Sequence, residues 1–202
     1  MSRVNSISQN RVLAAIIIWY VLAILAGGLG LTLRMAPPFL QIVLFGLVVL
    51  LLLLYWLSQS LRQWVLSVNI KLLVAVHLTR FVGFYFLFLY SRGQLPYEFA
   101  VLGGWGDIIV ASIALLIILL APLAGKSGWL IYLVWNFIGL VDILFVVATA
   151  ARLATADPKS MSELLGLPLS LLPTFLVPII IFTHIIIFIR LNTARRDGYI
   201  KL

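Results

Sequence analysis

Six long apolar stretches alternate with short polar segments along this chain. The stretches cover about residues 12–33, 39–57, 69–91, 98–121, 129–150 and 169–189. A helix of about 20 apolar residues crosses the hydrocarbon core of a bilayer, and each stretch is about that long. The pattern therefore predicts an all-α protein, a six-transmembrane-helix bundle in which residues 1–202 form a single integral membrane domain.

The polar segments and two prolines predict three further features. Ser58–Val68 places apolar residues at helical spacing opposite polar ones, with Trp64 among them, which is typical of a short helix at the membrane interface. Arg152–Leu167 is the most polar internal segment, and we expect an external loop that ends in a short surface helix. Pro173 and Pro178 predict kinks in the sixth stretch, because proline removes a backbone donor from a helix.

Composition agrees with a membrane protein and excludes several kinds of site. The chain is 64% hydrophobic and 10% charged, whereas soluble domains are about 25% charged. It contains no cysteine, which excludes disulfides, iron–sulfur clusters and thiolate zinc sites. A formal charge of +8 in so apolar a chain indicates contact with a lipid bilayer, and with anionic lipid at its basic ends, rather than with nucleic acid. A homo-oligomer and a partner membrane subunit both stay open.

Lysine and arginine gather on one side of the predicted bundle. Six spans leave both termini on the same side, and nine basic residues lie there. They are Arg3, Arg11, Arg62, Lys71, Lys126, Arg190, Arg195, Arg196 and Lys201. The other side has four, which are Arg34, Arg92, Arg152 and Lys159. Because cytoplasmic loops of membrane proteins carry the excess of basic residues, both termini are predicted to be cytoplasmic.

Ionisable residues inside the apolar stretches mark a candidate site. Arg80 and Asp107 lie at nearly equal distances along the chain from the turn at Gly93–Gln94, so a hairpin of two spans brings them to one depth. A charge in the middle of a bilayer costs ~2.5–3.5 kcal/mol on insertion scales, and we therefore expect these two residues to pair. At a rise of ~1.5 Å per residue, Asp142 lies near the same middle level. Arg80 is then flanked by two carboxylates.

The spacing of small and polar residues predicts which helix faces line this centre. One face consists of Asn69, His77, Arg80 and Phe84, and another of Gly103, Gly104, Asp107, Ala111 and Ala114. Residues three and four apart share a face of an α-helix. Asn136 lies in the same stretch as Asp142 and is expected to join the centre. Trp105 lies too deep for the aromatic belts at the membrane surface, and we expect it to wall the centre.

Two histidines lie on the cytoplasmic side of the predicted charge layer. Counted from the cytoplasmic ends of their spans, His77 is roughly 13 Å deep and His184 roughly 8 Å deep. Two interpretations stay open. Either each histidine is packed and hydrogen-bonded in the protein interior, or the two ligate haem b together, as in an electron-transfer protein.

Four short motifs around the hairpin form one pattern. They are Arg80-Phe81-Val82-Gly83, Gly93-Gln94-Leu95-Pro96, Phe99-Ala100 and Gly104-Trp105-Gly106-Asp107, the last continuing through Ile108-Ile109-Val110-Ala111. The pattern resembles that of a family of bacterial integral membrane proteins without an assigned activity. The resemblance covers about a quarter of the chain and implies a polytopic fold in a bacterial inner membrane. It implies no activity.

Gly104-Trp105-Gly106-Asp107 is also similar to the Gly-x-Gly-Asp motif of presenilin-type intramembrane aspartyl proteases. In that family the second aspartate precedes the motif by one span, whereas Asp142 follows it here, and the Tyr-Asp and Pro-Ala-Leu signatures are missing. The two carboxylates of a protease dyad share a proton, and Arg80 between them would oppose this sharing. We therefore do not expect a protease.

The residues together predict a binder or transporter of small molecules or ions, with no catalytic residue, no metal and no cofactor. The site residues are Arg80, Asp107, Asp142, Asn136 and His77. An Arg80–Asp107 pair is already neutral, so Asp142 is a surplus carboxylate that must be protonated, solvated by a cavity or neutralised by a bound cation. The alternatives are the haem protein with His77 and His184, and a structural or accessory membrane subunit whose charges only fix helix packing.

Overall fold

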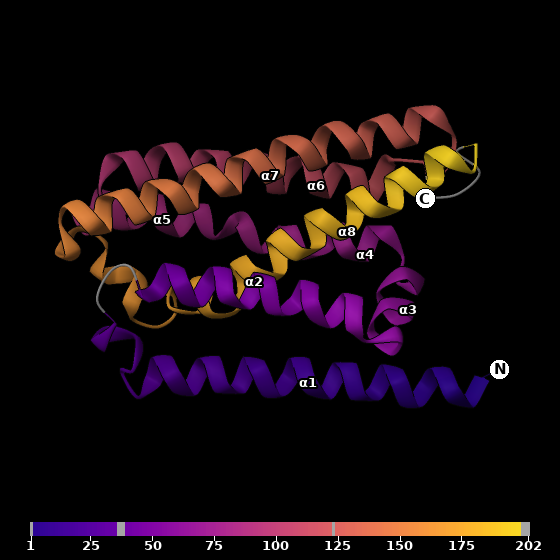
Figure 1. Ribbon diagram of the computed structural model, residues 1–202. Helices are drawn as coiled ribbons and strands as arrows, with labels where there is room; N and C mark the ends of the chain where they lie inside the picture. The colour runs from indigo at the N-terminus through magenta and orange to yellow at the C-terminus, as the bar shows by residue number, and fades with distance from the viewer. Residues whose placement is uncertain (1, 36–38, 123, 199–202) are drawn as a thin grey trace. The chain divides into compact units, whose positions relative to one another are not determined.

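The computed structural model describes residues 2–35, 39–122 and 124–198, and Figure 1 shows its helices. Within these ranges the regular structure is helical throughout and includes no strand, which confirms the all-α prediction for them. Lys201 and the side chain of Arg3, two of the basic groups used for the orientation, lie outside what the structure describes.

The helices follow one another in a simple order. They are α1 (Ser2–Gly28), η1 (Thr32–Arg34), α2 (Phe39–Leu57), α3 (Gln59–Ser67), α4 (Ile70–Ala75), η2 (Val76–Val82), α5 (Gly83–Ser91), η3 (Glu98–Gly103), α6 (Gly104–Leu120), α7 (Gly125–Ala156), η4 (Pro158–Leu165), η5 (Leu172–Leu176) and α8 (Val177–Arg196). Of these, η1, η2 and η4 are 3₁₀-helices, and η3 and η5 are π-helices.

Six helical stretches among the described residues are long and apolar enough to cross a membrane. They are Gln9–Gly28, Phe39–Leu57, Ile70–Ser91, Glu98–Leu120, Gly125–Ala156 and Leu172–Arg196. The described residues therefore contain the predicted number of membrane-length apolar helices. The second stretch has the bounds that the sequence predicted, 39–57.

The chain forms two compact units, of which unit 1 consists of Met1–Val68 and Ser162–Ile179. In unit 1, α3 packs against both α1 and α2, and η5 packs against the same two helices. The hydroxyl of Ser58 accepts a hydrogen bond from the backbone N–H of Leu61 at 3.2 Å, which caps α3. The short helix predicted at Ser58–Val68 is therefore present.

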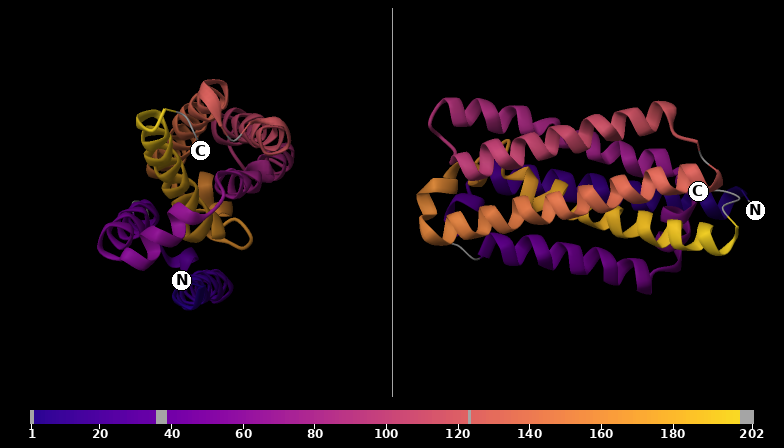
Figure 2. Two further views of the ribbon diagram at one scale, coloured as in Figure 1. Left: turned by 90° about the vertical axis from the view of Figure 1, so that its right-hand side faces the viewer. Right: turned by 90° about the horizontal axis from the view of Figure 1, so that it is seen from above.

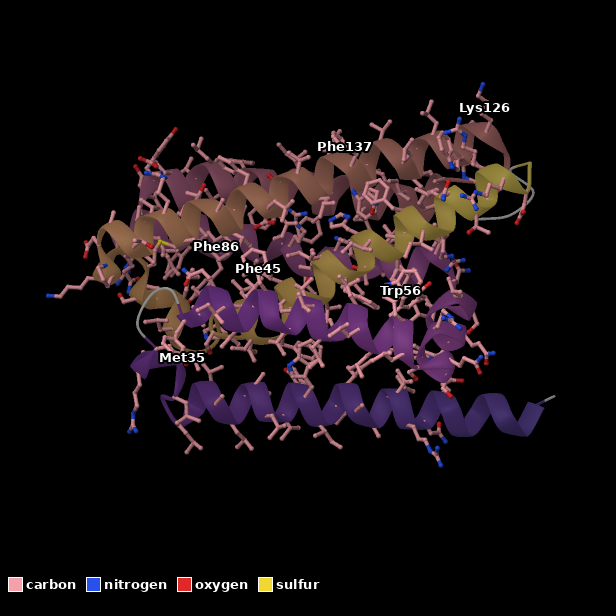
Figure 3. The ribbon with its side chains drawn as sticks, in the orientation of Figure 1. Met35, Phe45, Trp56, Phe86, Lys126 and Phe137 are labelled. Atoms are coloured by element: carbon pink, nitrogen blue, oxygen red, sulfur yellow. The ribbon has the colours of Figure 1, made fainter. Side chains whose placement is uncertain are left out.

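Unit 2 consists of Asn69–Met161 and Ile180–Leu202, and α6 packs in it against α4, η2, α5, η3 and α7. Figure 2 shows α6 and α7 running side by side. A Cβ atom on Gly83 would overlap the carbonyl oxygen of Gly104, so the backbones of α5 and α6 touch. Small residues permit this close approach of membrane helices. Beside the contact lies Phe86, which is 2% exposed, whereas Phe137 on α7 is 60% exposed (Figure 3).

The fifth span is longer than the sequence predicted. We predicted a helix over 129–150 and a loop from Arg152, but α7 runs without interruption to Ala156. No glycine or proline lies between Gly139 and Pro158, so nothing breaks the helix before the Asp157-Pro158 step. The rest of the predicted loop is mostly η4, which buries Met161 and Leu164. The prediction of an external loop starting at Arg152 is therefore wrong for the first five residues.

The first and last spans also differ from their predicted bounds. α1 ends at Gly28 rather than near residue 33, because Gly27 and Gly28 are poor helix formers and Gly30 has a φ of +67°, which favours glycine. The apolar residues that follow lie in a turn and in η1. α8 continues beyond the predicted end at residue 189 as far as Arg196.

Three of the membrane-length stretches contain a segment that is not α-helical. η5 contains Pro173, where the sequence predicted a disturbance of the sixth span. η2 and η3 contain no proline, yet η2 carries His77 and Arg80, and η3 leads directly into the Gly104-Trp105-Gly106-Asp107 motif. Such segments within long helices often mark functional positions.

Candidate functional site

Arg80 connects three backbone segments of unit 2. Its Nε donates to Oδ1 of Asp107 at 2.6 Å, and its Nη2 donates to Oδ2 of Asp142. Its Nη1 donates to the backbone carbonyl of Gly139 at 2.9 Å. The predicted pairing of Arg80 with Asp107, and the predicted second carboxylate from Asp142, are therefore both present. We call Arg80, Asp107 and Asp142 the charged centre.

The members of the charged centre differ in accessibility. The side chain of Arg80 is 1% exposed and that of Asp107 is 4% exposed, whereas that of Asp142 is 18% exposed. One arginine between two ionised aspartates gives the centre a formal charge of −1. The surplus negative charge therefore belongs to a cluster in which one carboxylate, that of Asp142, is partly exposed.

The 3₁₀ geometry of η2 decides which residues share a face with Arg80. Residues three apart are eclipsed in a 3₁₀-helix, and His77, Arg80 and Gly83 are all buried. We predicted a face at α-helical spacing that included Phe84, but Phe84 is 56% exposed. That prediction is wrong because η2 turns further per residue than an α-helix does. Asn69 caps the start of α4, where its Oδ1 accepts from the N–H of Lys71 at 2.9 Å.

The predicted face of α6 is confirmed, and the role predicted for Trp105 is wrong. The buried residues of this helix include Gly104, Asp107, Ala111 and Ala114, with Gly103 buried just before it. Trp105 is 52% exposed and does not line the charged centre. At about 100° per residue, a side chain two positions before Asp107 points to the opposite side of the helix.

Asn136 joins a different group from the one expected. We expected it beside Asp142, but its Oδ1 accepts from Nδ1 of His184 at 2.8 Å, and its Nδ2 donates to the carbonyl of His184 at 3.0 Å. His77 lies in the same group, because its Nε2 is 3.2 Å from Oγ1 of Thr183. All of these side chains belong to unit 2.

His77 and His184 are in direct contact. Their ring centroids are 4.2 Å apart, both side chains are fully buried, and Trp135 packs against His77 with its centroid at 4.9 Å. Axial ligation of haem by both histidines would place the iron and the porphyrin plane between the two rings. Rings in contact leave no room for a macrocycle, so this arrangement does not fit haem b.

Sequence reasoning missed Gly139, Trp135 and Thr183. Gly139 is the point where the two polar groups meet, since its carbonyl accepts from Arg80 and a Cβ atom on it would lie 2.8 Å from Cε1 of His184. It lies three residues after Asn136 and three before Asp142, and this spacing was the available signal. Trp135 and Thr183 offered no signal beyond being polar or aromatic within a span.

Six apolar helices and a buried Arg/Asp cluster place the chain in the class of multi-pass helical membrane proteins. More narrowly, the chain belongs to the family described as a domain of unknown function, DUF8737, whose model matches residues 37–192. No curated protein and no solved structure matches it. The matched range includes every residue of the charged centre and both histidines.

Proposed function

We propose that this chain is a bacterial inner-membrane protein that binds a small polar solute or an ion at the charged centre, as a binding protein or a transporter. One observation carries the proposal. Arg80 engages two carboxylates, although one would neutralise it, and the second carboxylate, that of Asp142, remains accessible. Ionisable residues in membrane spans most often mark substrate or ion pathways.

The charge balance supports binding of a cationic group or a proton. A formal charge of −1 at mid-span is unfavourable in hydrocarbon, so a bound cation, a proton or solvent must compensate it. Asp142 is the group that a ligand reaches first, because the other two members are almost completely buried.

The local backbone supports the same proposal. The two helices that contribute Arg80 and Asp107 are each irregular close to these residues, at η2 and η3. Irregular backbone within a membrane span is tolerated where it is buried in protein or lines a polar site.

The test is Asp142→Asn, which keeps the shape of the side chain and removes its charge. We measure the melting temperature of the purified protein between about pH 5 and about pH 8, in NaCl and in choline chloride. The wild-type melting temperature should depend on pH or on Na⁺, because a species that binds only the folded state stabilises it. Asp142→Asn should remain folded and lose this dependence.

Glu98→Gln is the matched control, since Glu98 forms an exposed ion pair with Arg152 in the same unit. It should leave the dependence unchanged. If the wild-type protein shows no dependence on any of these conditions, and Asp142→Asn lowers the melting temperature as much as Asp107→Asn does, the binding proposal is wrong.

That outcome would favour a structural or accessory subunit instead. The observation that favours a structural role is the hydrogen bond from Arg80 to the carbonyl of Gly139. It connects η2 to α7, as a contact that serves only helix packing would. In that case all three charges serve only to hold the helices of unit 2 together.

The proposal includes an orientation with both termini in the cytoplasm. The chain has no cysteine, so single cysteines at Arg196 and at Arg92 report each side without background labelling. A membrane-impermeant thiol reagent added to intact spheroplasts should label Arg92→Cys and not Arg196→Cys. Labelling of Arg196→Cys alone would reverse the orientation.

We also propose that the purified protein is colourless. The contact between His77 and His184 supports this, because it leaves no space for a porphyrin between the rings. An absorption band in the Soret region that disappears in both His77→Gln and His184→Gln would contradict it.

A groove of unit 2 supports contact with anionic lipid. The groove has a volume of about 470 Å³ and is lined by Trp129, Leu133, Phe188, Ile189, Leu191, Asn192 and Arg195. The guanidinium of Arg195 lies 6.0 Å from the centroid of the Trp129 ring. Native mass spectrometry should detect retained phosphatidylglycerol in preference to phosphatidylcholine, with less retention in Arg195→Gln than in Arg11→Gln. Equal retention of both lipids would refute this part of the proposal.

A further inference from the structure

The two histidines of the chain form a buried pair that the charged centre does not use. His77 comes from η2 and His184 from α8, and both are 0% exposed. Their rings are tilted by 53° with centroids 4.2 Å apart, and Trp135 packs against both, 4.9 Å from His77 and 5.8 Å from His184. We call these two residues the imidazole pair.

Hydrogen bonds determine which nitrogen of His184 carries a proton. The amide of Asn136 is oriented by its Nδ2, which donates to the backbone carbonyl of His184 at 3.0 Å. Its Oδ1 therefore faces Nδ1 of His184 at 2.8 Å, and since an amide oxygen only accepts, Nδ1 must donate. The other nitrogen, Nε2, is then an unprotonated acceptor. It is buried, lies against Gly139 and has no hydrogen-bond donor facing it among the described residues.

The same reasoning assigns the proton of His77. The hydroxyl of Thr183 donates to the carbonyl of Ile180 at 2.9 Å, so its single proton is already used. Nε2 of His77 lies 3.2 Å from this hydroxyl oxygen, and we infer that Nε2 is the donor, because the hydroxyl proton then serves the carbonyl of Ile180. Nδ1 of His77 is then an unprotonated acceptor, buried and without a partner. Each ring of the imidazole pair thus has one buried lone pair to which none of the described residues donates.

The charged centre lies next to the imidazole pair through Gly139. The carbonyl of Gly139 accepts from Arg80, and its Cα packs against the ring of His184. Arg80 of η2 is the charged side chain that acts on both rings, and its charge opposes a proton there. The neighbouring helices also carry Asp107 on α6, Asp142 and Tyr132 on α7 and, six positions after His184, Arg190 on α8. One added proton would bring the formal charge of the pair and the centre together from −1 to zero.

We propose that the imidazole pair binds one proton, which balances the charged centre, so that the centre is coupled to protons. Burial of the pair disfavours an imidazolium, so binding of the proton rests on the surplus negative charge of the charged centre, and its coupling to a bound solute or ion rests on the proposed function. A second proton is not taken up, because two imidazolium rings in contact would repel each other strongly. The free lone pairs are where the proton adds, and no other bond forms or breaks.

The test uses the full chain in lipid nanodiscs with ¹⁵N-labelled histidine. Nitrogen shifts distinguish Nδ1–H, Nε2–H and imidazolium forms, and with two histidines in the chain the spectrum contains two residues. At about pH 8 we expect one ring of each neutral form, His184 with Nδ1–H and His77 with Nε2–H. On acidification one imidazolium per protein should form. Two neutral rings down to the pH of unfolding, or two imidazolium rings, would overturn the proposal.

Variants separate this proposal from the proposed function. Asp142→Asn removes the surplus charge, so the midpoint of pair protonation should fall by about one pH unit or more, roughly a tenfold loss of proton affinity. Asp157→Asn changes an exposed carboxylate outside the centre and should leave the midpoint unchanged. An unmoved midpoint in Asp142→Asn would refute the coupling.

Failure of the proposed function has a different signature. If the pair takes up its proton as expected and its midpoint falls in Asp142→Asn, while the melting temperature of this variant depends on Na⁺ just as that of the wild type does, the solute-binding proposal fails and the proton site stands. His77→Gln and His184→Gln serve only to assign the spectrum. The decisive readout is made on the wild-type chain, so poor folding of either variant leaves the test intact.

Discussion

The helix α2 of unit 1 and the hairpin α4–α6 of unit 2 differ in charge, in burial and in the regularity of their backbones. α2 has no charged residue, and 17% of the residues in its most apolar 18-residue segment are buried in the protein. In the two stretches of the hairpin, which contain His77, Arg80 and Asp107, 39% and 44% of the most apolar 18-residue segments are buried. α2 is a regular α-helix, whereas the hairpin contains a 3₁₀ and a π segment. Of these two regions, the regular helix is the more exposed one, and the hairpin with irregular segments carries the buried polar groups.

The cause of an irregular segment also differs between the units. In unit 1 the π-helix η5 contains Pro173, and a missing backbone donor is a sufficient reason for it. In unit 2 neither η2 nor η3 contains a proline. There the hydrogen bonds of Arg80, His77 and Asp107 stabilise a backbone conformation that points these side chains into the protein interior. An irregular helix without proline is therefore the more informative sign of a site.

The largest expected effect is that of Arg80→Ala compared with Arg152→Ala, because both remove an arginine from an ion pair of unit 2. Arg80 is buried between two carboxylates, whereas the Arg152–Glu98 pair is 61% and 53% exposed. By analogy with soluble proteins, Arg80→Ala should lower the free energy of unfolding by ~3–5 kcal/mol. Arg152→Ala should lower it by at most ~1 kcal/mol. Unfolding in detergent by sodium dodecyl sulfate measures both.

A double-mutant cycle sharpens this comparison. Arg80→Ala and Asp107→Ala each leave a buried charge unpaired, so the double variant should lose less stability than the sum of the two single losses. Simple additivity would mean that Arg80 and Asp107 do not interact in the folded protein.

The next comparison concerns two glycine-to-alanine substitutions whose effects on stability should have opposite signs. Gly83 touches the backbone of Gly104, and a Cβ atom there would also lie 3.0 Å from Cγ1 of Ile108, so Gly83→Ala should destabilise by ~1–3 kcal/mol. A Cβ atom added at Gly46 in α2 would meet nothing within 4 Å, so Gly46→Ala should stabilise by up to ~1 kcal/mol. Thermal denaturation of the two purified variants measures both shifts. A stabilising Gly83→Ala would show that α5 and α6 do not touch.

The smallest effect compares one polar contact in each unit. Asn136→Leu leaves Nδ1–H of the fully buried His184 without an acceptor and should destabilise by ~1–3 kcal/mol. In unit 1, Trp19→Phe removes the indole donor to the carbonyl of Thr174, a 2.9 Å bond at a partly buried position, and should cost about 1 kcal/mol. The midpoint of unfolding of each variant gives the comparison. An equal or larger loss in Trp19→Phe would break the contrast between the units.

The positions of the spans and the level of the charges follow from the order of residues alone. Apolar length locates a span, as the bounds of α2 illustrate. Arg80 and Asp107 meet because they are nearly equally far from the turn between them, which holds for any hairpin of two extended helices. The local sequence led to a wrong prediction at Arg152–Ala156, where we expected a loop. This polar stretch is helical, because it contains no glycine or proline that would end the helix.

What only the tertiary structure decided is how each helix is rotated about its axis. A span that is apolar on every side has no strong periodicity, and lipid accepts any rotation of it, so Trp105 and Phe84 were expected to face inward when they face outward. Over its seven residues, η2 turns about 20° per residue further than an α-helix, and this extra rotation changes which residues share a face with Arg80 and His77. The few polar side chains fix these rotations, because each must find a partner, and so the contact of His77 with His184 exists only in the folded chain.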